Sequence, residues 1–359
     1  MPLTRPRLTI RLDAVADNYR HLVDVAAGAA VGAAVKADAY GLGLVPVVSR
    51  LWDVGCREFF VASVEEGIAL RAALPDAVVN VFNGAMPGTE GDLIAHRLVP
   101  LVISGDQLAG WRTASAAHGT ALPVGLHVDT GINRTGLTPV EVDAVAADPS
   151  ALDGLELRHV LSHLASADDP ESPQSEEQLA RFREVRRRFP GGVASLANSA
   201  GTFRDPSFHL DLVRPGVALY GGWPIAGRPS PLRQTVVLEA PVMQLRDVGV
   251  GDRVGYGATY EVTKPERHAV VPVGYADGFH RAASNRAIAH VAGVAAPIVG
   301  RVSMDLIVVD VTGLPVEPGD AVELIGDHCP IDEVATAAGT ISYELLTSLG
   351  PRYERLYTG

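Results

Sequence analysis

Residues 31–43 read VGAAVKADAYGLG, and this stretch decides how the rest of the chain is interpreted. Its small and branched apolar residues end at Lys36, and a turn with Gly41 and Gly43 follows, which is typical of a buried strand that delivers one amine to the edge of a sheet. A desolvated lysine loses proton affinity, as an amine must before it attacks a carbonyl or holds a Schiff base. A lysine that buries only its aliphatic stem gives the same pattern, so both interpretations stay open here.

Apolar runs recur along the first part of the chain at intervals of roughly 15 to 35 residues. Segments of helical character separate them, as expected of consecutive strand–helix–strand units with parallel strands. Eight such runs predict a closed (β/α)₈ TIM barrel, because a doubly wound sheet usually has fewer strands. The runs are Val31–Val35, Phe59–Ala62, Val78–Phe82, Leu98–Ile103, Val124–Val128, Leu155–Leu161, Val193–Ala197 and Asp211–Val213.

Polar residues follow nearly all of these runs, at the strand ends where barrel enzymes build their active sites. They are Lys36, Ser63, Asn83, Ser104, Asp129, His163, Asn198, Ser199 and Arg214. Solvated loops give any barrel polar strand ends, but glycines also follow Lys36, Ser199 and Arg214 and provide flexible backbone suited to a phosphate. An amine, a phosphate cradle and an arginine at one barrel mouth suggest pyridoxal phosphate.

Two histidines, His159 and His163, lie four residues apart, which is a metal-ligand spacing on a helix. The surrounding residues predict a strand, and no third ligand is near in the sequence, so we expect no metal site. His163 could pack on a cofactor ring, and a structural histidine fits the sequence equally well.

Residues 223–232 read WPIAGRPSPL and end the strand–helix alternation, so we expect a domain boundary at this point. The predicted domains are a barrel over residues 1–225 and a smaller all-β domain over residues 226–359. Two short helices are expected near its end. The predicted β-rich runs are Thr235–Leu245, His268–Val273, Ile288–Val291, Ala296–Val299, Ile307–Val311 and Ala321–Ile325. Within this domain Tyr256 stands between two glycines, a placement that fits either a functional phenol or an ordinary surface turn.

Composition and charge exclude several classes of protein. The chain has 359 residues, 47% of them hydrophobic and 20% charged, enough for two globular cores. A net charge of -12 argues against nucleic acid as a partner, and the basic cluster at 181–188 follows acidic residues in a way that predicts one helix. No apolar run is long enough to cross a bilayer, and the N-terminal residues lack a signal core, so we expect a cytoplasmic protein.

Nine stretches together resemble one family, the alanine racemases among the fold-type III pyridoxal phosphate enzymes. The stretches run in family order along nearly the whole chain, and their number makes the resemblance specific. They are AVKADAYGLG, HVDTGINRTGL, LSHLASAD, LANSAG, LVRPGVALYG, VGYGATY, VGYADG, GRVSMD and ISYELL. The family's architecture, a barrel followed by a β-domain, agrees with the one predicted from the strand pattern.

The resemblance implies a bound pyridoxal 5′-phosphate. Lys36 would hold it as a Schiff base, His163 would lie beside its ring, and Arg214 would face the pyridine nitrogen. The residues that would bind its phosphate are Tyr40, Ser199, Gly216 and Tyr343.

The resemblance also implies racemisation of alanine in a homodimer. Racemisation needs a base on each side of the substrate, and these would be Lys36 for the D-enantiomer and Tyr256, from the partner subunit, for the L-enantiomer. Arg134 and the Met304 backbone would receive the substrate carboxylate, and Tyr275 would also bind the substrate.

Four residues depart from the family's pattern. His127 stands where many members have a carbamylated lysine that orders the substrate-binding arginine, so Asn133 or a bound anion would have to do so here. Ser303 replaces a frequent cysteine, and Asp38 and Leu42 replace a frequent asparagine and histidine.

Rival functions remain within the same fold type. A racemase for serine or a broader set of amino acids would share the motifs. A fold-type III decarboxylase would place a carboxylate against the pyridine nitrogen, where this chain has Arg214. A non-catalytic pyridoxal phosphate carrier would lack the second domain.

Overall fold

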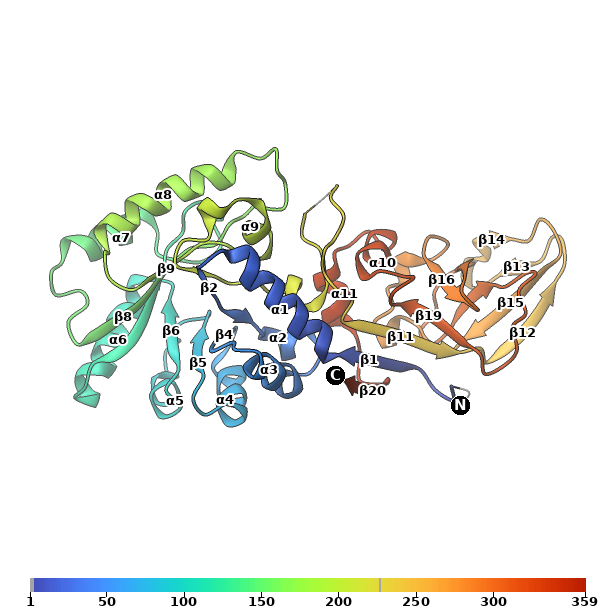
Figure 1. Cartoon of the computed structure of the whole chain (residues 1–359), viewed down its shortest axis with the longest axis horizontal. Helices are drawn as coiled ribbons and strands as arrows, with labels where there is room; N and C mark the ends of the chain where they lie inside the picture. The colour runs from blue at the N-terminus through green and yellow to red at the C-terminus, as the bar shows by residue number, and fades with distance from the viewer. Residues whose placement is uncertain (1–2, 226) are drawn as a thin grey trace.

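The computed structural model describes residues 3–225 and 227–359, which form two lobes lying side by side (Figure 1). In the first lobe a ring of parallel strands forms a barrel, and helices surround it. Its strands are β2 (Ala30–Val31), β3 (Ala33–Ala34), β4 (Glu58–Val61), β5 (Val78–Val81), β6 (Val99–Val102), β7 (Leu122–His127), β8 (Leu155–Leu161), β9 (Val193–Ser195) and β10 (Leu212–Val213). Only Gly32 separates β2 from β3, so these two short segments together occupy one strand position. The barrel therefore has eight strand positions, and the predicted (β/α)₈ barrel is confirmed.

The barrel closes around Gly32. On one side of this glycine β2 pairs with β10, and on the other side β3 pairs with β4. The Gly32 N–H donates to the carbonyl of Val213 at 2.9 Å. A Cβ on Gly32 would lie 2.6 Å from the ring of Phe60, so the closing strand has no room for a side chain here. Lys36 follows this closing strand at the barrel mouth.

Helices follow the barrel strands in the predicted alternation and pack their apolar faces on the outside of the barrel. They are α1 (Leu12–Ala26), α3 (Leu44–Asp53), α4 (Val64–Ala73), α5 (Glu90–Ala95), α6 (Gly105–His118), α7 (Pro139–Ala147), α8 (Gln174–Arg188) and α9 (Ser199–Arg204), with the short 3₁₀ helices η1 (Pro206–Phe208) and η2 (Val217–Tyr220). The segment α2 (Lys36–Tyr40) is a tight turn rather than a regular helix. Because each helix returns the chain to the start of the next strand, the loops that follow the strands collect at one end of the barrel.

The second lobe consists mostly of strands. Its largest sheet has the order β17-β16-β19-β11-β1-β20, and a smaller one has the order β12-β15-β18. The strands are β1 (Arg7–Arg11), β11 (Val236–Pro241), β12 (Gln244–Val248), β13 (Arg253–Val254), β14 (Tyr260–Glu261), β15 (Glu266–Val271), β16 (Ile288–Val291), β17 (Val294–Pro297), β18 (Ile307–Asp310), β19 (Ala321–Ile325) and β20 (Glu354–Thr358). The helical segments are η3 (Tyr256–Ala258), η4 (Tyr275–Asp277), η5 (Arg281–Ala283), α10 (Ile331–Ala337) and α11 (Ser342–Ser348).

Two features of this lobe differ from the expectation. The predicted run Thr235–Leu245 is two strands in different sheets, β11 and β12, and β11 ends at Pro241, which has no N–H to continue a ladder. The strand β1 precedes the barrel in the chain but lies in the second lobe, antiparallel to β11 and parallel to β20. The boundary after residue 225 stays a prediction, and β1 crosses it in space.

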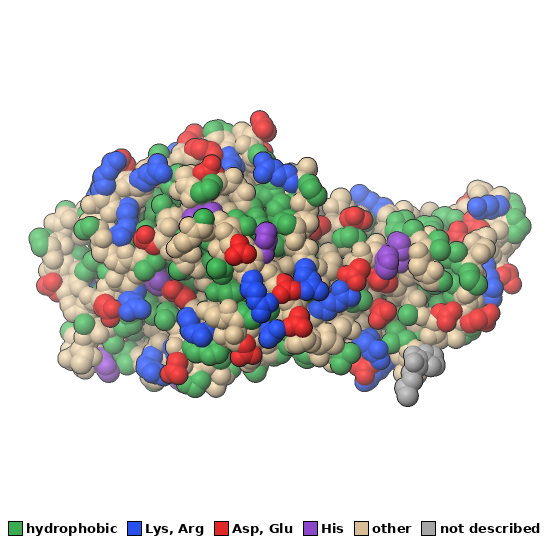
Figure 2. Space-filling model, viewed as in Figure 1, with side chains coloured by type: hydrophobic (Ala, Val, Ile, Leu, Met, Phe, Trp, Pro, Cys, Tyr) green, Lys and Arg blue, Asp and Glu red, His purple; other side chains and the backbone are tan. Residues whose placement is uncertain are grey.

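Charges are distributed over both lobes. Positive and negative side chains are interspersed on the face that Figure 2 shows. The acidic-to-basic pattern that predicted one helix corresponds to α8. Glu176 and Glu177 lie in its first turn and Arg186–Arg188 in its last, so the charges interact favourably with the helix dipole. Of the helices in 3–225 and 227–359, none has the length and apolarity to span a bilayer.

Candidate active site

A cavity of about 650 Å³ opens at the carboxyl ends of the barrel strands. Its walls come from the residues that end or follow β3 to β10, and α11 of the second lobe covers one side. Eight of the predicted site residues line it. They are Lys36, Tyr40, Arg134, His163, Ser199, Arg214, Gly216 and Tyr343.

The amine of Lys36 reaches into this cavity. The five residues before Lys36 are buried, and Lys36 is the first solvent-exposed residue after them. Partial loss of water in the cavity lowers the pKa of Lys36, and the positive charge of Arg134 lowers it further. Its Nζ lies 5.8 Å from the centre of the Phe82 ring. A lowered pKa leaves more of the amine unprotonated, the state that acts as a nucleophile or base.

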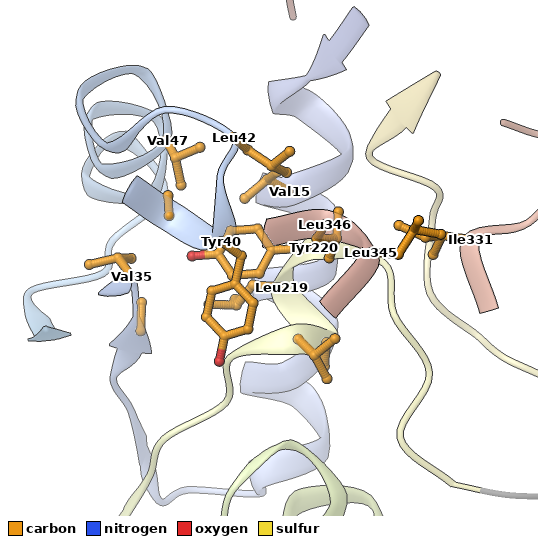
Figure 3. Close-up of a cluster of buried hydrophobic side chains, with 14 of the residues drawn as sticks. Val15, Val35, Tyr40, Leu42, Val47, Leu219, Tyr220, Ile331, Leu345 and Leu346 are labelled. Atoms are coloured by element: carbon orange, nitrogen blue, oxygen red, sulfur yellow. The ribbon is translucent and has the colours of Figure 1, made fainter. Parts of the chain in front are cut away.

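The turn after Lys36 has an unusual backbone. Ala37, Asp38, Ala39 and Tyr40 all have φ between 54° and 57°, the left-handed region that non-glycine residues avoid. At about 1 kcal/mol or more for each residue, this conformation has to be held by its surroundings. The rings of Tyr40 and Tyr220 pack together with their centroids 4.7 Å apart (Figure 3).

One carboxylate ties this turn to the neighbouring strand. Glu66 accepts hydrogen bonds from the backbone N–H groups of Ala37 and Ala62, both at 2.7 Å. Ala62 directly follows β4, so Glu66 fixes the start of the turn relative to the barrel. This contact spans residues far apart in the sequence.

Four polar groups converge at one end of the cavity. Ser199 Oγ accepts from the backbone N–H groups of Gly216 at 2.9 Å and Ala218 at 3.3 Å. A Cβ on Gly216 would lie 2.1 Å from the Tyr40 hydroxyl oxygen, so only glycine fits against this tyrosine. Desolvation raises the pKa of Tyr343 to about 12 and that of Tyr40 above its usual range. Both hydroxyls therefore stay protonated and can donate to an anion.

Arg214 lies under the cavity at the end of β10 and is almost fully buried. Its Nη1 donates to Ser195 Oγ, and its Nη2 donates to the carbonyl of Ser162 at 2.6 Å. Its Nε has no partner among residues 3–225 and 227–359. Burial lowers the pKa of Arg214 to about 10, so the guanidinium is still a cation at neutral pH. A buried donor without a partner is costly, and here it borders the cavity.

Two histidines in the cavity wall are kept neutral by their surroundings. Loss of water and the charge of Arg214 hold the pKa of His163 well below 6.5, and its Nε2 lies 3.5 Å from Asn198 Nδ2. Burial and the charges of Arg214 and Arg134 lower the pKa of His127 to about 4. Neither ring nitrogen of His127 has a hydrogen-bond partner in the part of the chain that the structure describes.

The loop that carries Arg134 is held at its start. Asp129 Oδ1 accepts from the backbone N–H groups of Gly131 at 2.8 Å, Ile132 at 3.0 Å and Asn133 at 3.2 Å. Among the described residues, the Asn133 side chain makes no hydrogen bond to Arg134, so the expected role of Asn133 in orienting this arginine has no support here. Arg134 is exposed at the cavity rim.

The remaining predicted residues lie in the second lobe, away from this cavity. Tyr256, Tyr275 and Met304 are 74%, 43% and 53% exposed, and none of them lines the cavity of the same chain. Two of them are neighbours, because the Tyr275 N–H donates to the carbonyl of Ser303 and the Ala276 N–H donates to that of Met304, both at 3.0 Å. One chain therefore brings together only the part of the predicted site that lines this cavity.

The sequence matches known proteins over nearly its whole length. Residues 10–224 match the family described as "Alanine racemase, N-terminal domain", and residues 235–357 match "Alanine racemase, C-terminal domain". The chain belongs to the alanine racemase family. The alanine racemase of Rhodospirillum rubrum is 46% identical over 357 residues, which cover 98% of this chain and 96% of that one.

Solved structures of alanine racemases have the same fold. The enzyme from Bartonella henselae, crystallised with covalently bound pyridoxal phosphate, is 39% identical, with a TM-score of 0.94 over 99% of this chain and 100% of that chain. The alanine racemase of Streptomyces lavendulae is 34% identical, with a TM-score of 0.92 over 99% of this chain and 97% of that chain.

The residues that depart from the alanine racemase pattern take part in local structure. Asp38 Oδ1 accepts from the Leu44 N–H at 2.6 Å and so helps to close the turn after Lys36. Leu42 is fully buried. Ser303 Oγ donates to the carbonyl of Leu306 at 2.7 Å and stabilises the loop that carries Met304.

Some strand-end residues have structural roles, and other cavity residues were not predicted. Ser63 and Ser104 accept hydrogen bonds as N-caps of α4 and α6 and lie outside the cavity wall. Phe82, Ile341 and Thr347 line the cavity. Phe82 could have been found as the last residue of a predicted strand. Ile341 and Thr347 carry no local signal, because only the packing of α11 on the barrel brings them there.

Proposed function

We propose that this protein interconverts L-alanine and D-alanine with pyridoxal 5′-phosphate as its cofactor. The observation that carries this proposal is the presence of two groups in one cavity. They are the Lys36 amine with its lowered pKa and the buried Arg214, whose Nε has no partner among the described residues. Membership of the alanine racemase family supports the reaction, and the Bartonella henselae relative with covalently bound pyridoxal phosphate supports the cofactor.

The cavity residues fit this cofactor. Lys36 would hold its aldehyde carbon, and Arg214 Nε would donate to its ring nitrogen. The neutral His163 ring would pack beside it without adding charge. Its phosphate would lie among the hydroxyls and N–H groups of Tyr40, Ser199, Gly216 and Tyr343, where Gly216 leaves room that a Cβ would fill. When bound, pyridoxal phosphate supplies an electron sink for the negative charge left at Cα of an amino acid.

Two residues would move the proton at Cα. The Lys36 amine would remove or return it on one side, and the Tyr256 hydroxyl would do so on the other. Arg214 can donate a hydrogen bond to the ring nitrogen but keeps its own proton, so it leaves the electron sink weak. A weak sink keeps the charge at Cα short-lived, which favours return of the proton to Cα over competing reactions such as transamination.

A complete site requires a second copy of the chain. We define the barrel half-site as the residues that line the cavity, and the second-lobe half-site as Tyr256, Tyr275 and Met304. The exposure of the second-lobe half-site supports a homodimer in which it completes the partner's cavity. There Arg134, from the barrel side, and the Met304 backbone would bind the substrate carboxylate. The cytoplasmic location stays a prediction.

A chiral product assay tests this function. The purified protein, loaded with pyridoxal phosphate, is given L-alanine, D-alanine, L-serine or L-lysine, and the enantiomers, amines and carbon dioxide are measured. We expect either alanine enantiomer to yield equal amounts of both, and no carbon dioxide. Release of carbon dioxide with an amine product, or failure to racemise alanine, would contradict the proposal. Faster racemisation of serine than of alanine would change the assigned substrate.

A further inference from the structure

Two arginines that lie three residues apart contact segments next to the two half-sites. We propose that Arg355 positions the turn after Lys36 and that Arg352 positions the loops of Tyr275 and Met304. Neither arginine lines the cavity, so each acts through other residues. This inference rests on the proposed function, which assigns the turn to cofactor binding and the two loops to the partner's substrate site.

Arg355 and Tyr357, both in β20, hold the left-handed turn from outside the barrel. Arg355 Nη1 donates to the carbonyl of Gly41 at 2.7 Å, and the Tyr357 hydroxyl donates to the carbonyl of Leu42 at 3.0 Å. A Cβ on Gly43 would lie 2.3 Å from the same tyrosine hydroxyl, so the turn and β20 are in direct contact. These hydrogen bonds fix the two carbonyls that follow Tyr40.

The helix α11 packs against the same turn from another side. Figure 3 shows Leu346 of this helix on the side of the Tyr220 ring. A Cβ on Gly41 would lie 2.8 Å from the carbonyl oxygen of Leu346, so the turn has no free space toward the helix. A strained backbone persists only where its surroundings over-determine it. The contacts with β20 and α11 therefore determine where the Tyr40 hydroxyl points, which is against Gly216 at the proposed phosphate end of the cavity.

Arg352 holds the other group of loops. Its Nε and Nη2 donate to the two carboxylate oxygens of Asp277 at 2.6 and 2.8 Å, and its Nη1 donates to Asp305 at 2.7 Å. Asp277 is almost fully buried and follows Tyr275 in η4, while Asp305 directly follows Met304. A bidentate arginine imposes a fixed geometry, so Arg352 sets the position of these two loops relative to each other.

The two arginines thus give one short segment control of two different active sites. In the proposed dimer, the turn held by Arg355 belongs to the cavity of its own chain, whereas the loops held by Arg352 complete the cavity of the partner. Arg355 lies in β20, which pairs along its whole length with β1, whereas Arg352 precedes this strand, so each arginine holds its own loops.

Cofactor binding tests Arg355. The apoenzyme is titrated with pyridoxal 5′-phosphate and, separately, with pyridoxal, which lacks the phosphate. Arg355→Met should raise the Kd for pyridoxal phosphate about tenfold, as expected for loss of a charged donor to a carbonyl, while pyridoxal binds as it does to the parent. Arg355→Lys, which keeps one donor, should recover part of the affinity. Arg7→Met is the matched control. Arg7, in β1, forms an ion pair at 3.3 Å with Glu354, which lies in β20 next to Arg355, but Arg7 contacts neither half-site.

Steady-state kinetics test Arg352. Arg352→Met should raise KM for both alanine enantiomers about tenfold, since loops misplaced by a fraction of an ångström bind substrate poorly, while its Kd for pyridoxal phosphate stays at the parent value.

A second variant tests the turn if Arg355→Met does not fold. Tyr357→Phe removes the hydroxyl that donates to the Leu42 carbonyl of the same turn, and it should raise the Kd for pyridoxal phosphate by a smaller factor.

Failure of the inference differs from failure of the proposed function. If the parent protein racemises alanine but Arg355→Met binds pyridoxal phosphate normally, or loses pyridoxal equally, the role of Arg355 is wrong. If Arg352→Met weakens the cofactor and leaves KM unchanged, the division between the two arginines is wrong. A parent protein that neither binds pyridoxal phosphate nor racemises alanine overturns both proposals.

Discussion

The two half-sites differ in how far one chain completes them. The barrel half-site is enclosed by strand ends and α11, and its charged and polar groups, such as Arg214 and Ser199, are buried and held by hydrogen bonds within the chain. The second-lobe half-site is exposed, with Tyr256 74% accessible on a short segment between two glycines. The first is built by the folding of one chain, whereas the second is completed by a partner chain only in the proposed dimer.

This difference in burial explains why a single chain already shifts the pKa values of residues in the barrel half-site. The shifted pKa values of Lys36, His127 and His163 arise from partial or complete desolvation and from the nearby charges of Arg134 and Arg214. Tyr256, by contrast, is exposed in the single chain. The comparison leads to three predictions, in order of decreasing effect.

The largest effect is expected from Lys36→Ala. Loss of this amine should remove the visible absorbance of the lysine-bound cofactor and lower the racemase rate by at least about a thousandfold. The chain offers a matched control, because its only other lysine is the exposed Lys264. Lys264→Ala should keep both the absorbance band and the activity. Borohydride reduction followed by peptide mapping would locate the cofactor, and a label on Lys264 would contradict the assignment.

Mixing two inactive variants should restore part of the activity. Lys36→Ala retains Tyr256, and Tyr256→Phe retains Lys36, so a mixed dimer has one intact site if the half-sites come from different chains. Random pairing of co-expressed chains should then give about a quarter of the parent activity, because half of the dimers carry one good site of two. Activity no higher than that of either variant alone would show that both residues act within one chain.

The smallest effect concerns acid sensitivity of the barrel half-site. The pKa of His127 is about 4 in the folded chain and near 6.5 in an unfolded one, so between these values only the unfolded chain binds the proton. The free energy of unfolding should therefore fall as the pH is lowered from 6.5 to 4. His127→Gln should reduce this slope by up to about 1.4 kcal/mol per pH unit.

Urea unfolding of the apoprotein at pH 5 and pH 7 measures that slope. His118 is an exposed histidine at the end of α6 and provides the control substitution His118→Gln. Equal slopes in His127→Gln and the parent protein would mean that His127 is not held neutral by burial.

Much of the barrel could be predicted from the sequence, because its strands are short apolar runs with periodic spacing. All eight runs correspond to strands of the barrel, and α8 follows its charge pattern. The second lobe was predicted less well. Its run from Thr235 is split at Pro241 into strands of two sheets, and β1 joins a sheet formed by residues more than 200 positions later, which no local pattern reveals.

The sequence by itself determined the residue types at the strand ends, and with them the choice of Lys36, His163, Ser199 and Arg214 as cavity residues. Such residues can be identified because a parallel barrel brings every strand end to one rim. Only the tertiary structure decided how Lys36 is positioned. The left-handed turn after it is anchored by Glu66, 29 residues from Ala37, and by Arg355, 314 residues from Gly41. These anchors depend on which loops meet in space, and hydrogen bonds between distant loops leave no periodic trace in a sequence.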